Sequence, residues 1–374
     1  MRERSFFFSL MLLTSVFFAV RLHAQEYQTL SIDSLAPDFS LPGIDGRLYS
    51  LSSFRDAKVL VLIFTCNHCP TAQSYEERIM QLTDDYRNKG VQVVAVNPND
   101  PRSLRPDELD FSDIGDSFDE MKIRARERHF NFPYLYDGDS EKMSKAYGPI
   151  ATPHVFIFDE SRRLRYQGRF DDEDRHGRTP HQLDARNAVD ALLDNRPVAV
   201  PITKVFGCSI KWSDKRNWIV KSRLAWSKES VILDTISLTG GRNLLRNYSQ
   251  KLRLVSFWST ASQISSEQFP ELITINRMYR DRDFELVTVS FNTQTQKAEV
   301  LHFLKKEQAS SRNYIFSGDA ISFLRLAGAS GQDGLPMTLL IEPGGKVVFR
   351  KKGAIDPSKL KKEIIDNRMI GRYY

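Results

Sequence analysis

Cysteine is scarce in this chain, which has only three among its 374 residues. So few cysteines exclude a small domain stapled by several disulfides, and they cannot supply a zinc site made of two C-x-x-C pairs. After residue 25 the chain also lacks any apolar run close to the ~20 residues that cross a membrane. Aromatic residues do not alternate regularly with basic ones, so we expect no nucleic-acid partner.

The length and composition are those of a globular protein with two domains. Hydrophobic residues make up 41% of the chain and charged residues 27%, which excludes a disordered chain. A chain of this length is too long for one ordinary core. The formal net charge is +6, and the excess of positive charge lies after Trp212. Peripheral contact of this basic part with the cell envelope is a hypothesis that rests on charge alone.

Residues 1–24 are predicted to be a signal peptide. A basic start with Arg2 and Arg4 precedes a mostly apolar run over residues 6–20, and Ala24 provides a small residue for cleavage. The late Arg21 and the large Leu22 leave an uncleaved N-terminal membrane anchor as the alternative. We therefore predict a periplasmic or secreted protein, in a compartment where disulfides persist.

Two of the cysteines, Cys66 and Cys69, form a C-x-x-C directly after the apolar run 59–64. This arrangement at a strand-to-helix junction indicates a thiol–disulfide oxidoreductase. Two cysteines on the first turn of a helix are close enough to form a disulfide, and the helix N-terminus would favour a thiolate at Cys66. His68 between them would add positive charge. We predict that Cys66 attacks and that Cys69 resolves the mixed disulfide.

Other interpretations of the cysteines remain open. The pair could be half of a zinc site completed by histidines, or a structural disulfide, although so short a loop constrains the unfolded chain very little. The third cysteine, Cys208, is either a second resolving thiol or a small buried residue. We predict neither a metal nor another cofactor.

The first half of the chain alternates between the periodicities of strands and helices. A charged insertion over residues 98–130 is expected to be part loop and part helix. The expected strands are 47–51, 59–64, 91–96, 152–158 and 164–168, and the expected helices are 74–87 and 183–193.

Several motifs in this half resemble the thioredoxin-like superfamily, in its redoxin branch related to alkyl hydroperoxide reductase. They are the F-T-C-N-H-C-P box at 64–70, A-P-D-F at 36–39, Thr152-Pro153 and G-C-S-I-K-W at 207–212. The resemblance covers residues 34–212 and implies a central mixed sheet flanked by helices. It also implies a cis Thr152–Pro153 bond, and a Thr152 backbone that helps to hold an extended thiol substrate. The implied partners are protein thiols or disulfides and a further redox protein.

Two other functions stay open beside thiol–disulfide exchange. A peroxiredoxin-like thiol peroxidase belongs to the same superfamily, but that family has a threonine three residues before its reactive cysteine. Three residues before Cys69 stands Cys66. The other alternative is a redox-sensing binding protein of the cell envelope.

The second half resembles a degenerate copy of the same domain. Residues 255–265 resemble the thioredoxin-like F-W-A-T-W-C-x-x-C, with Ser262 and Ser265 in place of the two cysteines. Residues 335–341 likewise resemble 152–158. Because serine cannot form a disulfide, we predict a redox-inert thioredoxin-like domain over residues 238–374, after a linker over 213–237. The predicted fold class is thus α/β with two thioredoxin-like domains, and removal of the second is expected to leave exchange intact.

Overall fold

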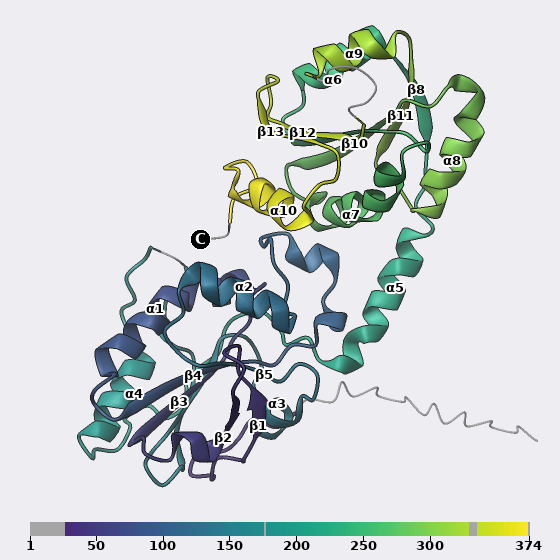
Figure 1. The fold of residues 1–374 in the computed structure, drawn as a ribbon. Coiled ribbons are helices and arrows are strands. Elements are labelled where there is room, and N and C mark those ends of the chain that lie inside the picture. The colour runs from purple at the N-terminus through teal and green to yellow at the C-terminus, as the bar shows by residue number, and fades with distance from the viewer. Residues whose placement is uncertain (1–26, 176, 329–334, 373–374) are drawn as a thin grey trace, which may run out of the picture.

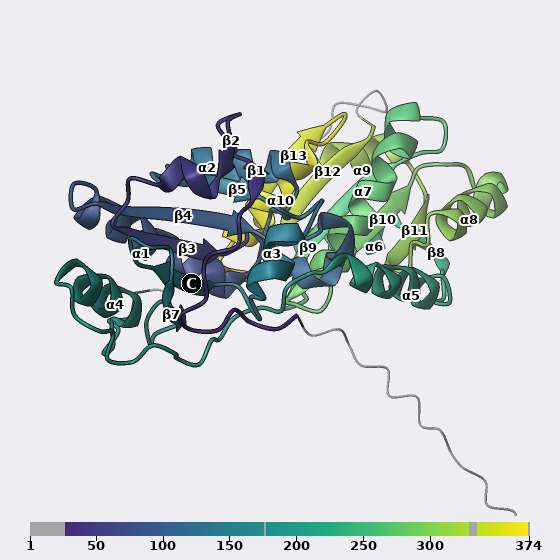
Figure 2. The ribbon, with the colours of Figure 1, turned by 90° about the horizontal axis from the view of Figure 1, so that it is seen from below.

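The computed structural model describes residues 27–175, 177–328 and 335–372, which form two α/β domains that lie side by side and are joined by a helix (Figures 1 and 2). The predicted signal peptide over residues 1–24 lies outside the described residues. Within the described ranges, no helix combines the length and the hydropathy that a membrane span requires.

The first domain is built on a five-stranded sheet with the order β5-β4-β3-β6-β7. The three strands β3, β4 and β5 are parallel, whereas β6 and β7 run antiparallel to their neighbours. All six residues of the central strand β3 are buried, because helices and loops cover both faces of the sheet. The strands are β3 (Val59–Phe64), β4 (Val91–Asn97), β5 (Tyr134–Tyr136), β6 (His154–Phe158) and β7 (Leu164–Gly168).

Alternate residues of β3 point into two separate hydrophobic cores. Val61 and Ile63 pack with residues of α1, α2 and α4 on one face, and Leu60 and Leu62 pack with residues of α3 and of a small β1–β2 hairpin on the other. The elements of these two layers are β1 (Ser40–Pro42), β2 (Leu48–Ser50), α1 (Pro70–Tyr86), α2 (Phe118–Arg128), α3 (Lys142–Tyr147) and α4 (Asp184–Leu193).

The charged insertion is part loop and part helix, as predicted. It contains α2 and two short 3-10 helices, Pro101–Ser103 and Pro106–Leu109. Residues 105–117, which we call the bridging segment, reach the second domain. Leu109 packs against the core of that domain, and the carbonyl oxygen of Ser112 accepts a hydrogen bond from the Tyr279 hydroxyl at 2.8 Å.

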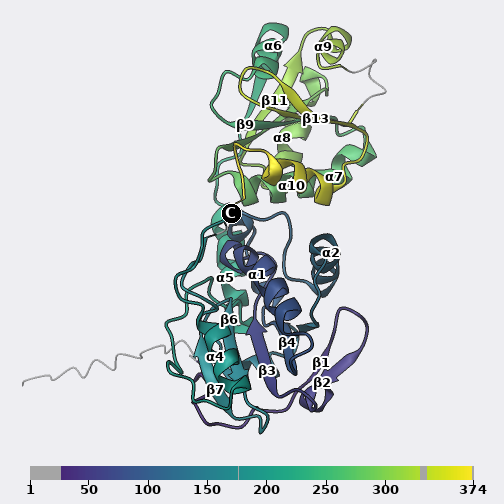
Figure 3. The ribbon, with the colours of Figure 1, turned by 90° about the vertical axis from the view of Figure 1, so that its left-hand side faces the viewer.

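The second domain repeats the sheet of the first and adds one strand. Its order is β13-β12-β9-β10-β11-β8, in which β9, β10 and β11 are parallel and β12 and β13 antiparallel, as in the first domain. Figure 3 shows α7 and α10 on the side that faces the first domain. The elements are β8 (Leu233–Ser237), α6 (Leu238–Arg246), β9 (Leu252–Trp258), α7 (Gln263–Tyr279), β10 (Phe284–Ser290), α8 (Lys297–Lys306), β11 (Arg312–Ser317), α9 (Ala320–Leu326), β12 (Met337–Ile341), β13 (Val347–Lys352) and α10 (Pro357–Asp366). The predicted fold class is confirmed.

The segment over residues 213–237 is more ordered than a simple linker. It contains α5 (Arg216–Trp226) and the edge strand β8. Leu233 and Ile236 of β8 are buried in the two cores of the second domain, so this domain begins before residue 238, the boundary that we predicted. Only Leu233 and Ile236 of the five residues of β8 are buried, and they do not alternate with exposed residues, so the sequence carries no strand periodicity that would mark it.

Candidate active site

The C-x-x-C lies between β3 and α1, but only Cys69 belongs to the helix. Cys69 is the N-cap of α1, and its sulfur accepts a hydrogen bond from the Ala72 N–H at 3.4 Å. Pro70 takes the first helical position, where the missing N–H costs no intrahelical bond. The prediction that both cysteines lie on the first turn is therefore wrong, because Cys66 precedes the helix. The N-terminus of α1 therefore lies at Cys69 and not at Cys66.

A buried carboxylate, that of Asp116, holds the turn between the two cysteines. The backbone N–H groups of Asn67 and His68 both donate to Asp116 Oδ1, at 2.8 and 3.1 Å. The Asn67 side chain also donates to the carbonyl oxygen of Gly115 at 2.8 Å. These bonds attach the turn to the bridging segment, and the residues of the turn lie outside α1. Sequence analysis missed Asp116, since it lies 48 residues from His68 and no motif surrounds it.

His68 is held between this carboxylate and the Cys66 thiol. Its Nδ1 atom lies 2.5 Å from Asp116 Oδ2, and both side chains are buried. Burial opposes a charge on the ring, but the Asp116 carboxylate and the Cys66 sulfur raise the pKa of His68 to about 10. Burial likewise opposes a charge on Asp116, but His68 and the hydrogen bonds around it keep the pKa of Asp116 below its usual value. His68 is therefore an imidazolium at neutral pH.

The same three residues are a group that could hold a metal ion, since the ligand atoms of Cys66, His68 and Asp116 lie within 4.8 Å of one another. However, Asp116 Oδ2 also accepts a hydrogen bond from Asn99 Nδ2 at 2.7 Å, so that each carboxylate oxygen already has two donors. A carboxylate so occupied orients a histidine. We therefore interpret the group as a thiol, an imidazolium and the carboxylate that positions it.

Thr152 lies against all three cysteines. Its Oγ1 atom is 3.2 Å from Cys66 Sγ, and its carbonyl oxygen is 3.5 Å from Cys69 Sγ. Its backbone forms an antiparallel bridge with Cys208. The Thr152–Pro153 bond is cis, as the resemblance implied. Residues from three distant parts of the first domain thus meet at one point.

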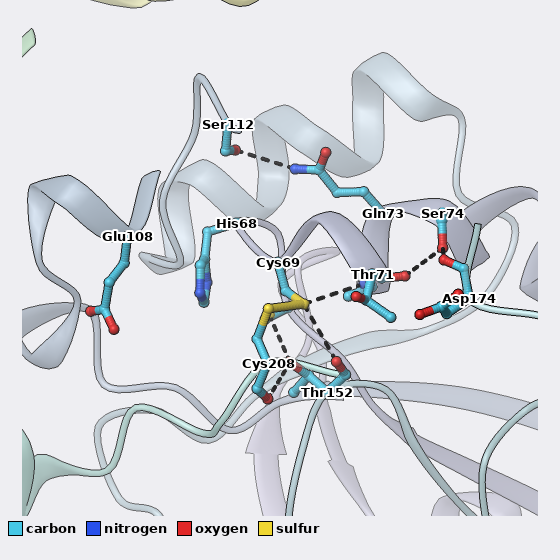
Figure 4. Close-up of a disulfide and its surroundings, with 12 residues drawn as sticks. His68, Cys69, Thr71, Gln73, Ser74, Glu108, Ser112, Thr152, Asp174 and Cys208 are labelled. Atoms are coloured by element: carbon cyan, nitrogen blue, oxygen red, sulfur yellow. Dashed lines mark hydrogen bonds between the residues drawn. A yellow bond between two sulfur atoms is a disulfide. The ribbon is translucent and has the colours of Figure 1, made fainter. Parts of the chain in front are cut away.

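The disulfide of the structure joins Cys69 to Cys208 (Figure 4). Cys66 is a buried free thiol. The Cα atoms of Cys69 and Cys208 are 5.9 Å apart, within the range that a disulfide spans. The pair that we predicted, Cys66 with Cys69, is not the pair in this state. Of the two interpretations of Cys208, the structure supports the one that makes it a thiol of the site.

The strand register shows which residues of the second domain replace the cysteines. Phe64 of β3 lies opposite His154, and Phe257 of β9 lies opposite Met337. His154 and Met337 each follow the proline of a cis peptide bond. Phe257 is therefore the counterpart of Phe64.

From this register, Ser259 corresponds to Cys66 and Ser262 to Cys69. Ser262 is the N-cap of α7, as Cys69 is of α1. The sequence analysis matched Ser262 and Ser265 with the two cysteines, so the predicted alignment lies three residues too far along the chain. Serine stands at every one of these positions, so no disulfide can form there.

A sheet of this order, with a C-x-x-C after its central strand and a cis proline beside it, defines the first domain as thioredoxin-like. The family model of the AhpC/TSA family matches residues 32–167. The first domain is therefore a member of the AhpC/TSA family, in agreement with the resemblance to redoxins.

Individual relatives share parts of the chain. The thiol-disulfide oxidoreductase ResA of Geobacillus thermodenitrificans (strain NG80-2) is 24% identical over 140 residues, which are 37% of this chain and 70% of ResA. The crystal structure of a hypothetical protein from Sinorhizobium meliloti 1021 is 34% identical and covers 50% of this chain and 97% of its own, with a TM-score of 0.44. An uncharacterized conserved protein from Geobacillus kaustophilus is 36% identical over 49% of this chain and 93% of its own, also with a TM-score of 0.44.

Proposed function

We propose that this protein is a thiol–disulfide oxidoreductase that exchanges disulfides with protein thiols through Cys66 and Cys69. The observation that carries the proposal is the convergence of three cysteines on Thr152, two through their sulfurs and Cys208 through its backbone, with an imidazolium beside the free thiol. Similarity to ResA, a thiol-disulfide oxidoreductase, supports the class.

The two cysteines have different tasks in this mechanism. The Cys69 thiolate, at the N-terminus of α1, attacks one sulfur of a substrate disulfide and releases the other sulfur as a thiolate. The Cys66 thiolate then attacks the Cys69 sulfur. A Cys66–Cys69 disulfide forms, the second substrate sulfur leaves, and two electrons have passed to the substrate. The roles are the reverse of those predicted from the sequence, because the helix begins at Cys69 and not at Cys66.

His68 and Asp116 serve the resolving step. The imidazolium of His68 lies beside Cys66 and places a positive charge next to the sulfur that attacks in this step. Its proton can pass to the sulfur that leaves. Asp116 acts through His68, which it orients and keeps protonated. Asp116 is thus a positioning residue.

The proposed site of action is the periplasm or the exterior of the cell, with a signal peptide over residues 1–24. The partners would be protein thiols and disulfides and a further redox protein that recharges the pair. N-terminal sequencing of the protein recovered from the periplasm checks the export: a start near Gln25 supports it. An intact Met1 in the membrane fraction would favour the N-terminal anchor.

Trapping of mixed disulfides tests the mechanism. The double variant Cys66→Ser/Cys208→Ser keeps only Cys69 and should accumulate a mixed disulfide with a protein substrate such as insulin. The matched variant Cys69→Ser/Cys208→Ser keeps only Cys66, which is not the attacking thiol, and should accumulate far less. The single variant Cys208→Ser should still reduce insulin. Preferential trapping by Cys66 would restore the roles predicted from the sequence, and no reduction of insulin by Cys208→Ser would contradict the proposed function.

The same proteins distinguish the alternatives. A thiol peroxidase would consume hydrogen peroxide much faster than it exchanges disulfides, and it would pass through a sulfenic acid on Cys69. A redox sensor would form and lose its own disulfide once, without turnover of a substrate.

A further inference from the structure

A short segment of the protein itself covers the cysteine pair. Cys69 is fully buried and Cys66 only 3% exposed, whereas Gly207 and Ser209 on either side of Cys208 are exposed. The segment over residues 206–210 therefore lies between the pair and the solvent. An external substrate cannot reach Cys69 while this segment keeps its place.

The segment is bound to the site through its backbone. The Thr152 N–H donates to the Cys208 carbonyl oxygen at 3.0 Å, and the Cys208 N–H donates to the Thr152 carbonyl oxygen at 3.2 Å. The extended chain at Cys208 thus pairs with the residue that precedes the cis proline, and its sulfur is bonded to Cys69. Backbone pairing of this kind does not depend on the side chains of the bound segment.

Gly207 is the residue that permits this approach. A Cβ atom at this position would lie 2.1 Å from the Thr152 carbonyl oxygen and 3.2 Å from the Pro153 nitrogen. The φ angle of Gly207 is +147°, in the range that favours glycine. The glycine before Cys208 thus allows its sulfur to reach Cys69.

Both ends of the segment are anchored. Phe206 packs against the core next to α1, and Ile210 is 1% exposed. Beyond it, the Lys211 N–H donates to Asn99 Oδ1 at 2.9 Å, and the Nδ2 atom of the same Asn99 donates to Asp116. The anchors leave residues 207–209 as the part that can move when the disulfide opens.

We infer that residues 206–210 are an internal substrate of this site, and that the external substrates are of the same class: cysteines in extended protein segments with a glycine before the cysteine. The inference rests on the proposed function. Exchange inside the protein requires no added oxidant. The Cys66 thiolate attacks the Cys69 sulfur, the Cys66–Cys69 bond forms, the Cys69–Cys208 bond breaks, and Cys208 leaves as a thiolate that takes up a proton.

Once Cys208 has left, a substrate dithiol takes its place. One substrate thiolate attacks Cys69 and displaces Cys66, and the second substrate thiolate then attacks the first substrate sulfur and displaces Cys69. The substrate gains a disulfide and the Cys66–Cys69 pair is reduced. Cys208 therefore decides whether the oxidised protein is closed, with Cys69–Cys208, or open, with Cys66–Cys69.

The disulfide pattern tests the closed state. The reduced full-length protein is oxidised with glutathione disulfide, its free thiols are alkylated, and its peptides are mapped by mass spectrometry. We expect Cys69–Cys208 with an alkylated Cys66 in the wild type, and Cys66–Cys69 in the Cys208→Ser variant. Gly207→Ala should also shift the wild-type pattern towards Cys66–Cys69. The control Gly344→Ala, at another positive φ but with open space around it, should not. A wild type in which Cys208 is always alkylated overturns the inference.

A peptide tests the substrate class. The Cys66→Ser/Cys208→Ser protein is loaded at Cys69 with a thionitrobenzoate leaving group, and the peptide of residues 204–211, Lys-Val-Phe-Gly-Cys-Ser-Ile-Lys, is added. Release of the chromophore should be about tenfold slower with the same peptide carrying Gly207→Val, a difference of about 1.4 kcal/mol in activation free energy. Equal rates for the two peptides overturn the inference but leave the proposed function intact, because that function is tested by insulin reduction in Cys208→Ser.

Discussion

Replacement of Asp116 by asparagine should remove a pH-dependent part of the stability of the first domain. His68 has a pKa of about 10 in the folded protein, against an ordinary value of about 6.5 for histidine in an unfolded chain. Because the folded pKa is the higher one, this stabilisation is fully present below pH ~6.5 and is lost as the pH rises through about 10. Between these limits the folded state binds the extra proton, so the free energy of unfolding falls by about 1.4 kcal/mol per pH unit.

The Asp116→Asn variant lacks the carboxylate that holds this proton. Urea-induced unfolding of the first domain, measured at several values between pH 7 and 9, should show a decrease of about 2 to 3 kcal/mol in the wild type and a much flatter profile in the variant. At pH 7 the variant should be less stable by about 3 to 5 kcal/mol, as expected when one partner of a buried charge pair is removed. NMR of the His68 ring reports the protonation directly.

Asp171→Asn is the matched control for this measurement. Asp171 is also buried and pairs with Arg78 at 2.6 Å, but an arginine does not titrate in this range. Its replacement should lower the stability by the same amount at pH 7 and at pH 9. If Asp116→Asn gave a curve parallel to that of the wild type, His68 would not carry the proton and the imidazolium beside Cys66 would be refuted.

Further predictions concern the contacts that support the site. Tyr279→Phe removes the hydrogen bond to Ser112 and should cost about 1 kcal/mol, with faster hydrogen exchange in the bridging segment; Tyr248→Phe, at an exposed tyrosine, should change neither. Arg124→Met removes the bidentate partner of Glu76 and leaves Arg128 as its remaining ion pair; it should lower the free energy of unfolding by about 1 to 3 kcal/mol, whereas an unchanged stability would contradict the pairing. Leu62→Ala, in the fully buried strand β3, should cost about 2 to 5 kcal/mol by denaturant unfolding, and an unchanged midpoint would be inconsistent with the core.

The framework of this site could be predicted from the sequence because it depends on local signals. The short apolar run of β3 is typical of a strand buried on both faces, and Thr152–Pro153 is marked by the residues themselves. The internal repeat was also visible, since Phe257 and Leu335 stand in segments with the same pattern as those of the first domain.

What could not be predicted depends on contacts between distant residues. The turn between the two cysteines is held by Asp116, whose carboxylate accepts hydrogen bonds from the backbone of Asn67 and His68. Likewise, Cys208 lies 139 residues after Cys69, and the connectivity of disulfides does not follow from spacing. A sulfur as the N-capping group is a weak signal too, because serine, threonine, aspartate and asparagine are the usual caps.

The second domain and the turn between the two cysteines both contact the bridging segment. Tyr279 of α7 donates to the carbonyl oxygen of Ser112, and the hydroxyl of Ser112 accepts from the Gln73 side chain on α1. The same Gln73 amide donates to the carbonyl oxygen of Asn67, inside the C-x-x-C. Without residues 213–374, the carbonyl oxygen of Ser112 would lose the hydrogen bond from Tyr279, and Leu109 would lose its apolar cover. The bridging segment, which also carries Asp116, would then be held on one side only. The structure therefore argues against the expectation that removal of the second domain leaves exchange intact: exchange should slow because the charge of His68 depends on a carboxylate whose loop rests on that domain.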